Sequence, residues 1–398
     1  MYQRSSHARE ALSLFKEDFS NIQLAHSWAE QHAGQIGYAA YLCVVFPLVG
    51  SFILDKHQHP LERIRWLECS LEHLNLVPGF VSESVILSLL GRAHIAIGQT
   101  REAIAFFQQS LNKSRATGER DAELSALSNL GVAHFYLGET SLALESEEQA
   151  LSISQELDNR GAEAQITGDL GNVYFLEGDY QRATEMYELE LRIAREINDK
   201  QCEKGALLSL GLIAHLVHGK RSEAVEYYQD ALAITRELGD SHTEGILLGN
   251  LSNVYGVWGE TEKASEISDQ RIAIARELGD RRGEGKALYN RALFEREFGE
   301  NERAITLGES ALKILEPTCD AYITKMRQEV DGWRDGPVKP VSSISPELDY
   351  RINRRLQLSA EYQVALDQWK ALPWWRRLFT KRPELPSELL EAKSNDGV

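Results

Sequence analysis

Amide and carboxylate side chains recur at intervals of about forty residues through the middle of this chain. One series begins at Asn129, and a second lies three residues further along the chain. An amide side chain offers both a donor and an acceptor, the combination that holds the backbone of an extended polypeptide. Residues three apart on a helix share a face, so the two series predict one polar surface. The first series is Asn129, Asp169, Ser209, Asn250 and Asn290, and the second is Asn172 and Asn253.

Two interpretations of this surface remain open from the residues alone. In the first, it binds a protein or peptide ligand, and three aromatic neighbours receive ligand side chains. In the second, the asparagines form hydrogen bonds with neighbouring helix ends or with water. The aromatic candidates are Phe135, Phe175 and Tyr289.

The elements that would position these side chains belong to a unit that occurs six times. One register holds a small residue, where two helices approach closely, and a second holds a glycine that can end a helix with positive φ. A third is always alanine, and the fourth, two turns later on the same face, is leucine or isoleucine. The four registers are Gly91, Gly131, Gly171, Gly211, Ser252 and Ala292; Gly98, Gly138, Gly178, Gly219, Gly259 and Gly299; Ala103, Ala143, Ala183, Ala224, Ala264 and Ala304; and Leu111, Leu151, Leu191, Leu232, Ile272 and Leu312. Each copy therefore predicts two antiparallel helices whose apolar face only neighbouring copies can cover.

These units predict an all-α solenoid of αα-hairpins. All ten prolines lie at or before Pro78 or at or after Pro317, as an uninterrupted helical array requires. We expect five regions along the chain. They are N-terminal capping helices with a degenerate repeat over 1–78, six repeats over 79–319, a closing helix over 320–333, a proline-rich linker over 334–346, and a C-terminal helix with a basic, aromatic tail over 347–398.

The repeated unit resembles the tetratricopeptide repeats. The Leu-Gly…Tyr…Ala pattern of that family is matched in Leu170-Gly171, Tyr174 and Ala183, although the usual unit is about six residues shorter. The longer unit is similar to those of Pins/LGN-type adaptors, kinesin light chains and the sensor arms of bacterial STAND signalling NTPases, and residues 279–315 look most like the last group. The resemblance implies a right-handed superhelix whose concave face binds protein or peptide, with asparagines holding the peptide backbone.

Other chemistries find little support in the sequence. The phosphate-loop, dinucleotide, zinc-protease and nucleophile-elbow motifs do not occur in it, so we expect no catalytic residues, cofactor or metal. Gly283-Glu284-Gly285-Lys286 imitates a phosphate loop but falls at a predicted helix start. A net charge of −17 argues against nucleic-acid binding. Four cysteines without a CxxC motif fit a reducing cytoplasm, and we expect a monomer there.

One apolar segment raises the question of a membrane span. Residues 37–54 carry no charge, but Pro47 and Gly50 interrupt them. A segment that matches the second helix of the repeat follows at 61–71, with Arg63 in the alanine register. This pairing favours a buried helix of the degenerate repeat over a membrane span.

The C-terminal segment has a different composition from the repeats. Between Tyr350 and Arg382, eight residues are basic and two are acidic, and three tryptophans lie among them. Cations interleaved with aromatic residues suit docking to a partner or to a membrane surface. The alternative, which we favour, is that the tryptophans pack against the end of the solenoid and the cations meet its acidic surface. The candidate docking residues are Trp374, Trp375, Arg376, Arg377 and Phe379.

The sequence thus leads to one main hypothesis and two alternatives. The main hypothesis is a non-catalytic, cytoplasmic bacterial scaffold that acts as an adaptor or sensor for a protein or peptide ligand. The first alternative is the sensor arm of a STAND-type signalling NTPase whose ATPase domain is on another chain. The second is a membrane-surface scaffold anchored through the segment that contains Trp374 and Phe379.

Overall fold

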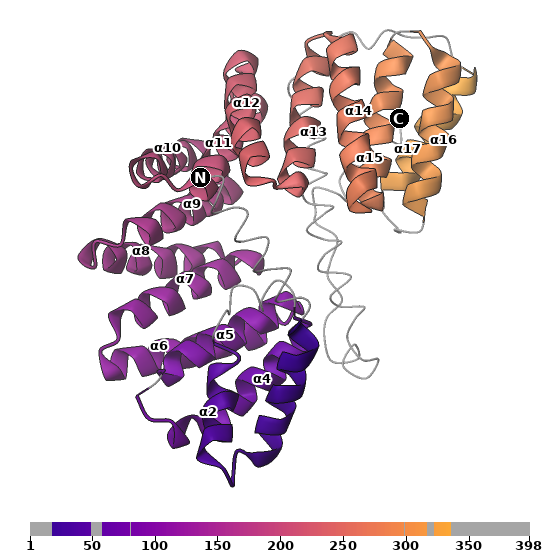
Figure 1. The fold of residues 1–398 in the computed structure, drawn as a ribbon. Coiled ribbons are helices and arrows are strands. Elements are labelled where there is room, and N and C mark those ends of the chain that lie inside the picture. Colours follow the sequence, from indigo (N-terminus) through magenta and orange to yellow (C-terminus); the bar gives the residue numbers. More distant parts are fainter. Residues whose placement is uncertain (1–17, 49–57, 80, 298, 317–321, 336–398) are drawn as a thin grey trace. The chain divides into compact units, whose positions relative to one another are not determined.

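The computed structural model describes residues 18–48, 58–79, 81–297, 299–316 and 322–335. All regular elements in these ranges are helices, which confirms the predicted fold class (Figure 1). They belong to two compact units, unit 1 at Met1–Gly178 and unit 2 at Asp179–Val398.

Unit 1 begins with helical residues 18–32. Its next elements, α2, α4 and a short 3-10 helix η1, precede the first complete hairpin, which α5 and α6 form. The bounds are α2 Gly37–Val45, α4 Pro60–His73, η1 Leu74–Leu76, α5 Glu83–Ala96, α6 Thr100–Thr117, α7 Arg120–Tyr136, α8 Thr140–Glu156 and α9 Arg160–Glu177.

Unit 2 continues the pattern, and its last described helix, α17, lies in the region where we expected a closing helix. The bounds are α10 Tyr180–Ile197, α11 Lys200–Leu216, α12 Arg221–Leu238, α13 Ser241–Val257, α14 Thr261–Leu278, α15 Arg281–Glu297, α16 Asn301–Leu315 and α17 Tyr322–Asp335.

Within each unit, every helix from α4 onwards packs against the one that follows it. The first helices of consecutive hairpins also touch, as α7 does with α9 in unit 1 and α13 with α15 in unit 2. This sequential packing is that of a hairpin solenoid, in which each pair covers the apolar face of the next. The first helices therefore lie side by side, and residues in the same register on them are neighbours.

Two registers that constrain the backbone have the expected geometry. All six alanines of the third register are fully buried, because each begins a second helix that packs tightly on the first. All six glycines of the second register have positive φ, between 62° and 85°. A side chain there would be strained, so these glycines fix the turn inside each hairpin.

In four hairpins the small residue of the first helix, Gly91, Gly131, Gly211 or Ser252, faces a residue of the second helix. A Cβ atom on Gly211 would lie 2.6 Å from the ring of Tyr228. Where the small residue is Ser252, the facing residue is also smaller, Ser268, and the two hydroxyl oxygens lie 2.7 Å apart. The close approach predicted for this register is thus present in α11 and α13.

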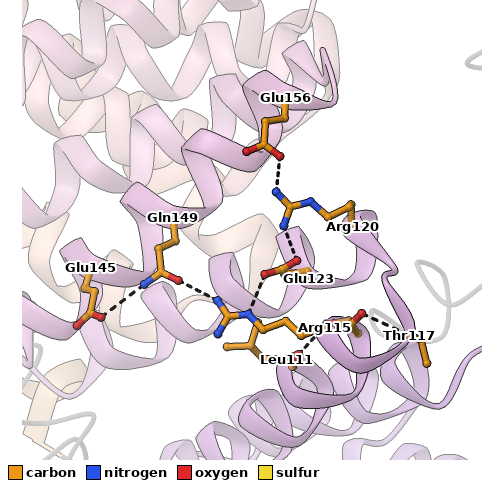
Figure 2. Close-up of polar contacts among 9 residues, drawn as sticks. Leu111, Arg115, Thr117, Arg120, Glu123, Glu145, Gln149 and Glu156 are labelled. Atoms are coloured by element: carbon orange, nitrogen blue, oxygen red, sulfur yellow. Dashed lines mark hydrogen bonds and ion pairs between the residues drawn. The ribbon is translucent and has the colours of Figure 1, made fainter.

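A polar network holds neighbouring hairpins together, as Figure 2 shows for α6, α7 and α8. The Glu123 carboxylate is 7% exposed and accepts hydrogen bonds from Arg115 at 2.8 Å and Arg120 at 2.6 Å, and Arg120 also pairs with Glu156. Burial opposes ionisation of Glu123, but the two guanidinium groups outweigh it and keep the pKa of this carboxyl below its usual range. The same arrangement recurs in Arg195, Lys200 and Glu203, and in Arg276, Arg281 and Glu284.

The apolar segment near the N-terminus contributes a short helix, α2, that is buried on one side. α2 packs against α4, and the Ser70 hydroxyl of α4 donates to the Cys43 carbonyl of α2 at 2.9 Å. Arg63, in the alanine register, is 2% exposed and donates to the Pro47 carbonyl. Among the described residues, no helix is long and apolar enough to cross a membrane.

Candidate functional site

In unit 1, the predicted polar residues lie on α7 and α9, which pack side by side. Asn129 is half-buried, and its amide donates to the Ser125 carbonyl of its own helix at 2.7 Å. Asp169 occupies the same register on α9, and Asn172, one turn later, is exposed. The packing of α7 on α9 therefore brings these positions together on one side of the unit.

In unit 2, α13 and α15 bring three predicted asparagines together. Asn250, Asn253 and Asn290 are all half-buried. The Asn290 amide donates to the Asn253 side-chain oxygen at 3.0 Å, so a hydrogen bond joins the two helices. This bond joins two side chains of neighbouring first helices, whereas the second sequence interpretation expected bonds to helix ends or to water. It leaves the Asn253 amide hydrogens and the Asn290 carbonyl oxygen as further hydrogen-bonding groups.

One predicted site residue, Tyr289, belongs to the core instead. Its side chain is 1% exposed, its hydroxyl donates to Glu329, and its ring stacks on Trp333 with centroids 6.1 Å apart. Both partners belong to α17, which covers this side of α15. Tyr289 is therefore not available to a ligand, and the expectation that it receives ligand side chains is corrected.

The other two aromatic candidates lie near the last turns of α7 and α9. Phe135 is half-buried, and its ring is tilted against that of the exposed Tyr136 at a centroid distance of 6.1 Å. Phe175 is also half-buried. Both rings are thus partly accessible on the helices that carry Asn129 and Asp169.

Sequence reasoning missed one residue of this region, Glu147 on α8. It is 1% exposed and lies against Gly131 of α7, and neither carboxylate oxygen has a hydrogen-bond partner among the described residues. The corresponding residues of the neighbouring second helices are aromatic, Phe107 on α6 and Tyr187 on α10. A comparison of this register across the copies would have revealed the exception.

Asp169 of α9 shares the unusual surroundings of Glu147. One of its carboxylate oxygens is buried without a hydrogen-bond partner among the described residues, although the side chain as a whole is partly exposed. Burial raises the pKa of Asp169 to about 7. Burial, and secondly the charge of Asp169, also raise the pKa of Glu147 well above its usual range. The two carboxyl groups are therefore close enough to interact.

These arrangements provide hydrogen-bonding and acidic groups on the first helices. Across the ranges that the structure describes, no three histidine, cysteine or acidic side chains gather as metal ligands would. Gly283 lies in the first turn of α15, and its amide donates to Asp280 at 2.8 Å, as in an ordinary helix cap. The C-terminal candidates Trp374, Trp375, Arg376, Arg377 and Phe379 lie outside the described residues.

Comparison with protein families gives a match to the tetratricopeptide repeat. The matched stretches overlap, at residues 82–156, 122–196 and 162–237. They cover α5 to α12 apart from the last residue of α12, and thus include hairpins of both units. A comparison with curated proteins gives no match.

Among solved structures, the fold is similar to that of a Signal Transduction ATPase with Numerous Domains (STAND) protein with a tetratricopeptide repeat sensor from Pyrococcus horikoshii. The TM-score is 0.60 at 17% identity, over 82% of this chain and 50% of that one, so the chain spans half of that protein's length. It is also similar to aspartyl phosphate phosphatase F from Bacillus subtilis, with a TM-score of 0.54 at 16% identity over 91% and 92% of the two chains. A Rap protein complexed with competence and sporulation factor gives a TM-score of 0.52 at 15% identity over 82% and 98%.

Proposed function

We propose that this chain, which matches the tetratricopeptide repeat over residues 82–237, is a non-catalytic scaffold that binds an extended peptide segment of a partner protein. The binding residues are the polar side chains of the first helices, which repeat with the hairpins. In unit 1 they are Asn129, Asp169 and Asn172, beside Phe135 and Phe175. In unit 2 they are Asn250, Asn253 and Asn290.

The observation that carries this proposal is the amide pair of α13 and α15. The Asn290–Asn253 hydrogen bond of 3.0 Å fixes the orientation of both amides. A fixed amide loses less conformational freedom when a ligand binds, and it keeps a donor and an acceptor for a peptide bond. The hydrogen bond between the helices is thus compatible with ligand binding, and it favours binding because it holds both amides in place before the ligand arrives.

The similar structures support the same class of function. A Rap protein with a similar fold is complexed with competence and sporulation factor, so this architecture accommodates a bound factor in at least one protein. We extend ligand binding, and not the identity of the ligand, to this chain. Phe135 and Phe175 are the side chains that would contact apolar groups of such a ligand.

A second candidate is the sensor arm of a larger signalling assembly. The similar STAND protein carries a tetratricopeptide repeat sensor, and the chain spans half of its length. A sensor of this kind would bind its ligand through the same polar face and transmit the binding to an ATPase on another chain. Addition of a peptide that this chain binds would then change the rate of ATP hydrolysis only when the separate ATPase protein is present. The purified chain alone would hydrolyse no ATP.

A random peptide library retained on immobilised full-length protein tests the main proposal. We expect the wild-type protein to enrich a set of peptides, and the Asn172→Ala, Asn250→Ala, Asn253→Ala triple variant to lose this enrichment by at least about tenfold, the equivalent of roughly 1.4 kcal/mol. Circular dichroism should show unchanged helix content in the variant.

Asn112→Ala provides a matched control, because Asn112 is an exposed amide on α6, a second helix. The control should retain the peptides as the wild-type protein does. If the folded triple variant enriched the peptides as strongly as the wild-type protein, the ligand would bind elsewhere. If Asn112→Ala lost enrichment as strongly as the triple variant, the binding residues would not be restricted to the first helices.

A further inference from the structure

Glu147 is an acidic residue in a register that holds an aromatic ring in the preceding hairpin. Phe107 of the preceding hairpin packs against Gly91, and Glu147 packs in the same way against Gly131. Its side chain is 1% exposed, and neither oxygen meets a donor in the part of the chain that the structure describes. A buried carboxylate without hydrogen bonds opposes folding. Packing alone gives no reason for this carboxylate.

Asp169 connects this buried carboxyl group to the surface. α9, which carries Asp169, packs against α8, which carries Glu147. One oxygen of Asp169 is buried without a partner, while the side chain remains partly exposed on the candidate face with Asn129 and Asn172. An approaching ligand would therefore meet the partly exposed Asp169 before the fully buried Glu147.

Two other titratable groups on α7 and α9 have partners of their own. His134 on α7 lies 2.6 Å from Glu139, and Glu163 on α9 accepts a hydrogen bond from Arg160 at 2.5 Å. Among the described residues, Asp169 is the charged group that perturbs the pKa of Glu147, whereas the pKa of Asp169 is raised by burial alone. Within the part of the chain that the structure describes, no cationic side chain is thus among the groups that shift the pKa of either carboxyl group.

We propose that Glu147 and Asp169 together form a receptor for an arginine side chain of the bound peptide. This inference rests on the proposed peptide binding and adds the charge of the ligand to it. A guanidinium group carries five donors in a planar fork, so it can serve carboxylate oxygens from two residues at once. It also remains charged when water is excluded, unlike a lysine ammonium, whose pKa shifts readily on burial.

Binding of arginine is coupled to release of a proton. The guanidinium group enters as a cation and pairs with ionised carboxylates, so any protons that Asp169 and Glu147 hold leave to solvent. Because the pKa of Asp169 is about 7, the proton on Asp169 is mostly present at pH 6 and mostly absent at pH 8. Affinity for an arginine peptide therefore rises with pH across this interval, whereas affinity for a neutral peptide does not.

Two matched peptide libraries test the receptor on the full-length protein. One carries arginine at a fixed central position among random residues, and the other carries citrulline, which has nearly the same shape without the charge. We expect the wild-type protein to retain the arginine library about tenfold more strongly at pH 8, with a smaller preference at pH 6. Glu147→Gln and Asp169→Asn should each reduce the preference, and the double variant should abolish both the preference and its pH dependence.

Glu148→Gln serves as the control, since Glu148 is an exposed acid next to Glu147 on α8 and the substitution removes the same charge. The control should keep the wild-type preference. Equal retention of both libraries by the wild-type protein would overturn the receptor while peptide binding stands. Retention of neither library would overturn the proposed function and the receptor with it. A preference that survives in the folded double variant would also overturn the receptor, because another acidic site would then hold the arginine.

Discussion

Replacing Glu147 by phenylalanine should stabilise the protein. The carboxylate is 1% exposed and has no hydrogen-bond partner within the described residues, and Phe107 occupies the same register against Gly91. A phenyl ring at 147 would therefore enter a space that another hairpin of unit 1 already fills with a ring.

The size of the effect follows from two contributions. Removal of buried polar atoms without partners recovers about 1–3 kcal/mol, and burial of a phenylalanine side chain contributes about 1.5–3 kcal/mol. Adjustment of the surrounding side chains opposes these by roughly 1 kcal/mol. We expect the free energy of unfolding at pH 7.5 to increase by about 3 kcal/mol, which corresponds to a rise in Tm of roughly 5–10 °C.

The stabilisation should depend on pH. The pKa of Glu147 is raised in the folded protein, so the unfolded chain releases this proton at a lower pH than the folded chain does. Wild-type stability is therefore reduced as pH rises above the ordinary carboxyl pKa of 4.5. Phenylalanine binds no proton, so the advantage of the variant should be smaller near pH 4, where only the packing contribution of the ring remains, and should grow toward pH 7 and above.

Thermal unfolding followed by circular dichroism between pH 4 and pH 8 measures both effects. Glu148→Phe is the matched control, because it adds the same ring at an exposed position, and its Tm should not rise. A Tm of Glu147→Phe below that of the wild type, or a gain that does not change with pH, would refute the reasoning, since the carboxylate would then have a favourable partner in the folded state.

Two further predictions concern α11. Gly211→Ala should destabilise the protein by about 1–3 kcal/mol, because its Cβ would lie 2.6 Å from the Tyr228 ring. Gly205→Ala, whose Cβ would have an ordinary contact at 3.6 Å, should stabilise it by about 0.5–1 kcal/mol. Urea unfolding measures both changes, and a change of the same sign in the two variants would contradict the close approach at Gly211. Lys204→Met should destabilise by about 1–2 kcal/mol at pH 7. Although burial opposes ionisation of Asp240, the hydrogen bond from Lys204 at 2.6 Å helps to lower the Asp240 pKa to about 2. The stability that this pair contributes is present above the ordinary pKa of 3.8 and is lost as pH falls toward 2. A destabilisation by Lys204→Met that stayed constant down to pH 2 would therefore argue against the ion pair.

The sequence predicts the backbone of the repeats well because its strongest signals report backbone constraints. A register that is always alanine requires close packing, and all six of these residues are fully buried. A register that is always glycine requires positive φ, and Gly98 and the equivalent residues have it. Such positions tolerate few residue types, so each copy repeats the same signal.

Tyr289 shows where the same reasoning fails. Asn290, its neighbour, belongs to a half-buried register, and the prediction extended that face to the aromatic ring. Three of the other copies hold a small residue in the register of Tyr289, namely Ser88, Gly168 and Gly249, and these three are buried. That pattern indicates close packing, and in the last copy α17 covers the larger ring with Trp333.

Glu147 was missed for a different reason. Its register is recognisable, but burial of a carboxylate depends on what surrounds it in three dimensions, and glutamate is usually exposed. The register alone would have favoured a ring, as at Phe107. Glu147 and Asp169 lie on different helices, α8 and α9, and a pattern along one helix carries no information about such a pair.

Hydrogen–deuterium exchange of the full-length protein, with and without a peptide selected from the library, tests the central claim most directly. We predict that the peptide slows amide exchange in first helices, either in the pair α7 and α9, in the pair α13 and α15, or in both pairs. The Asn172→Ala, Asn250→Ala, Asn253→Ala variant should show no such slowing. Slowing confined to the second helices α8, α12 and α14, in wild type and variant alike, would contradict it.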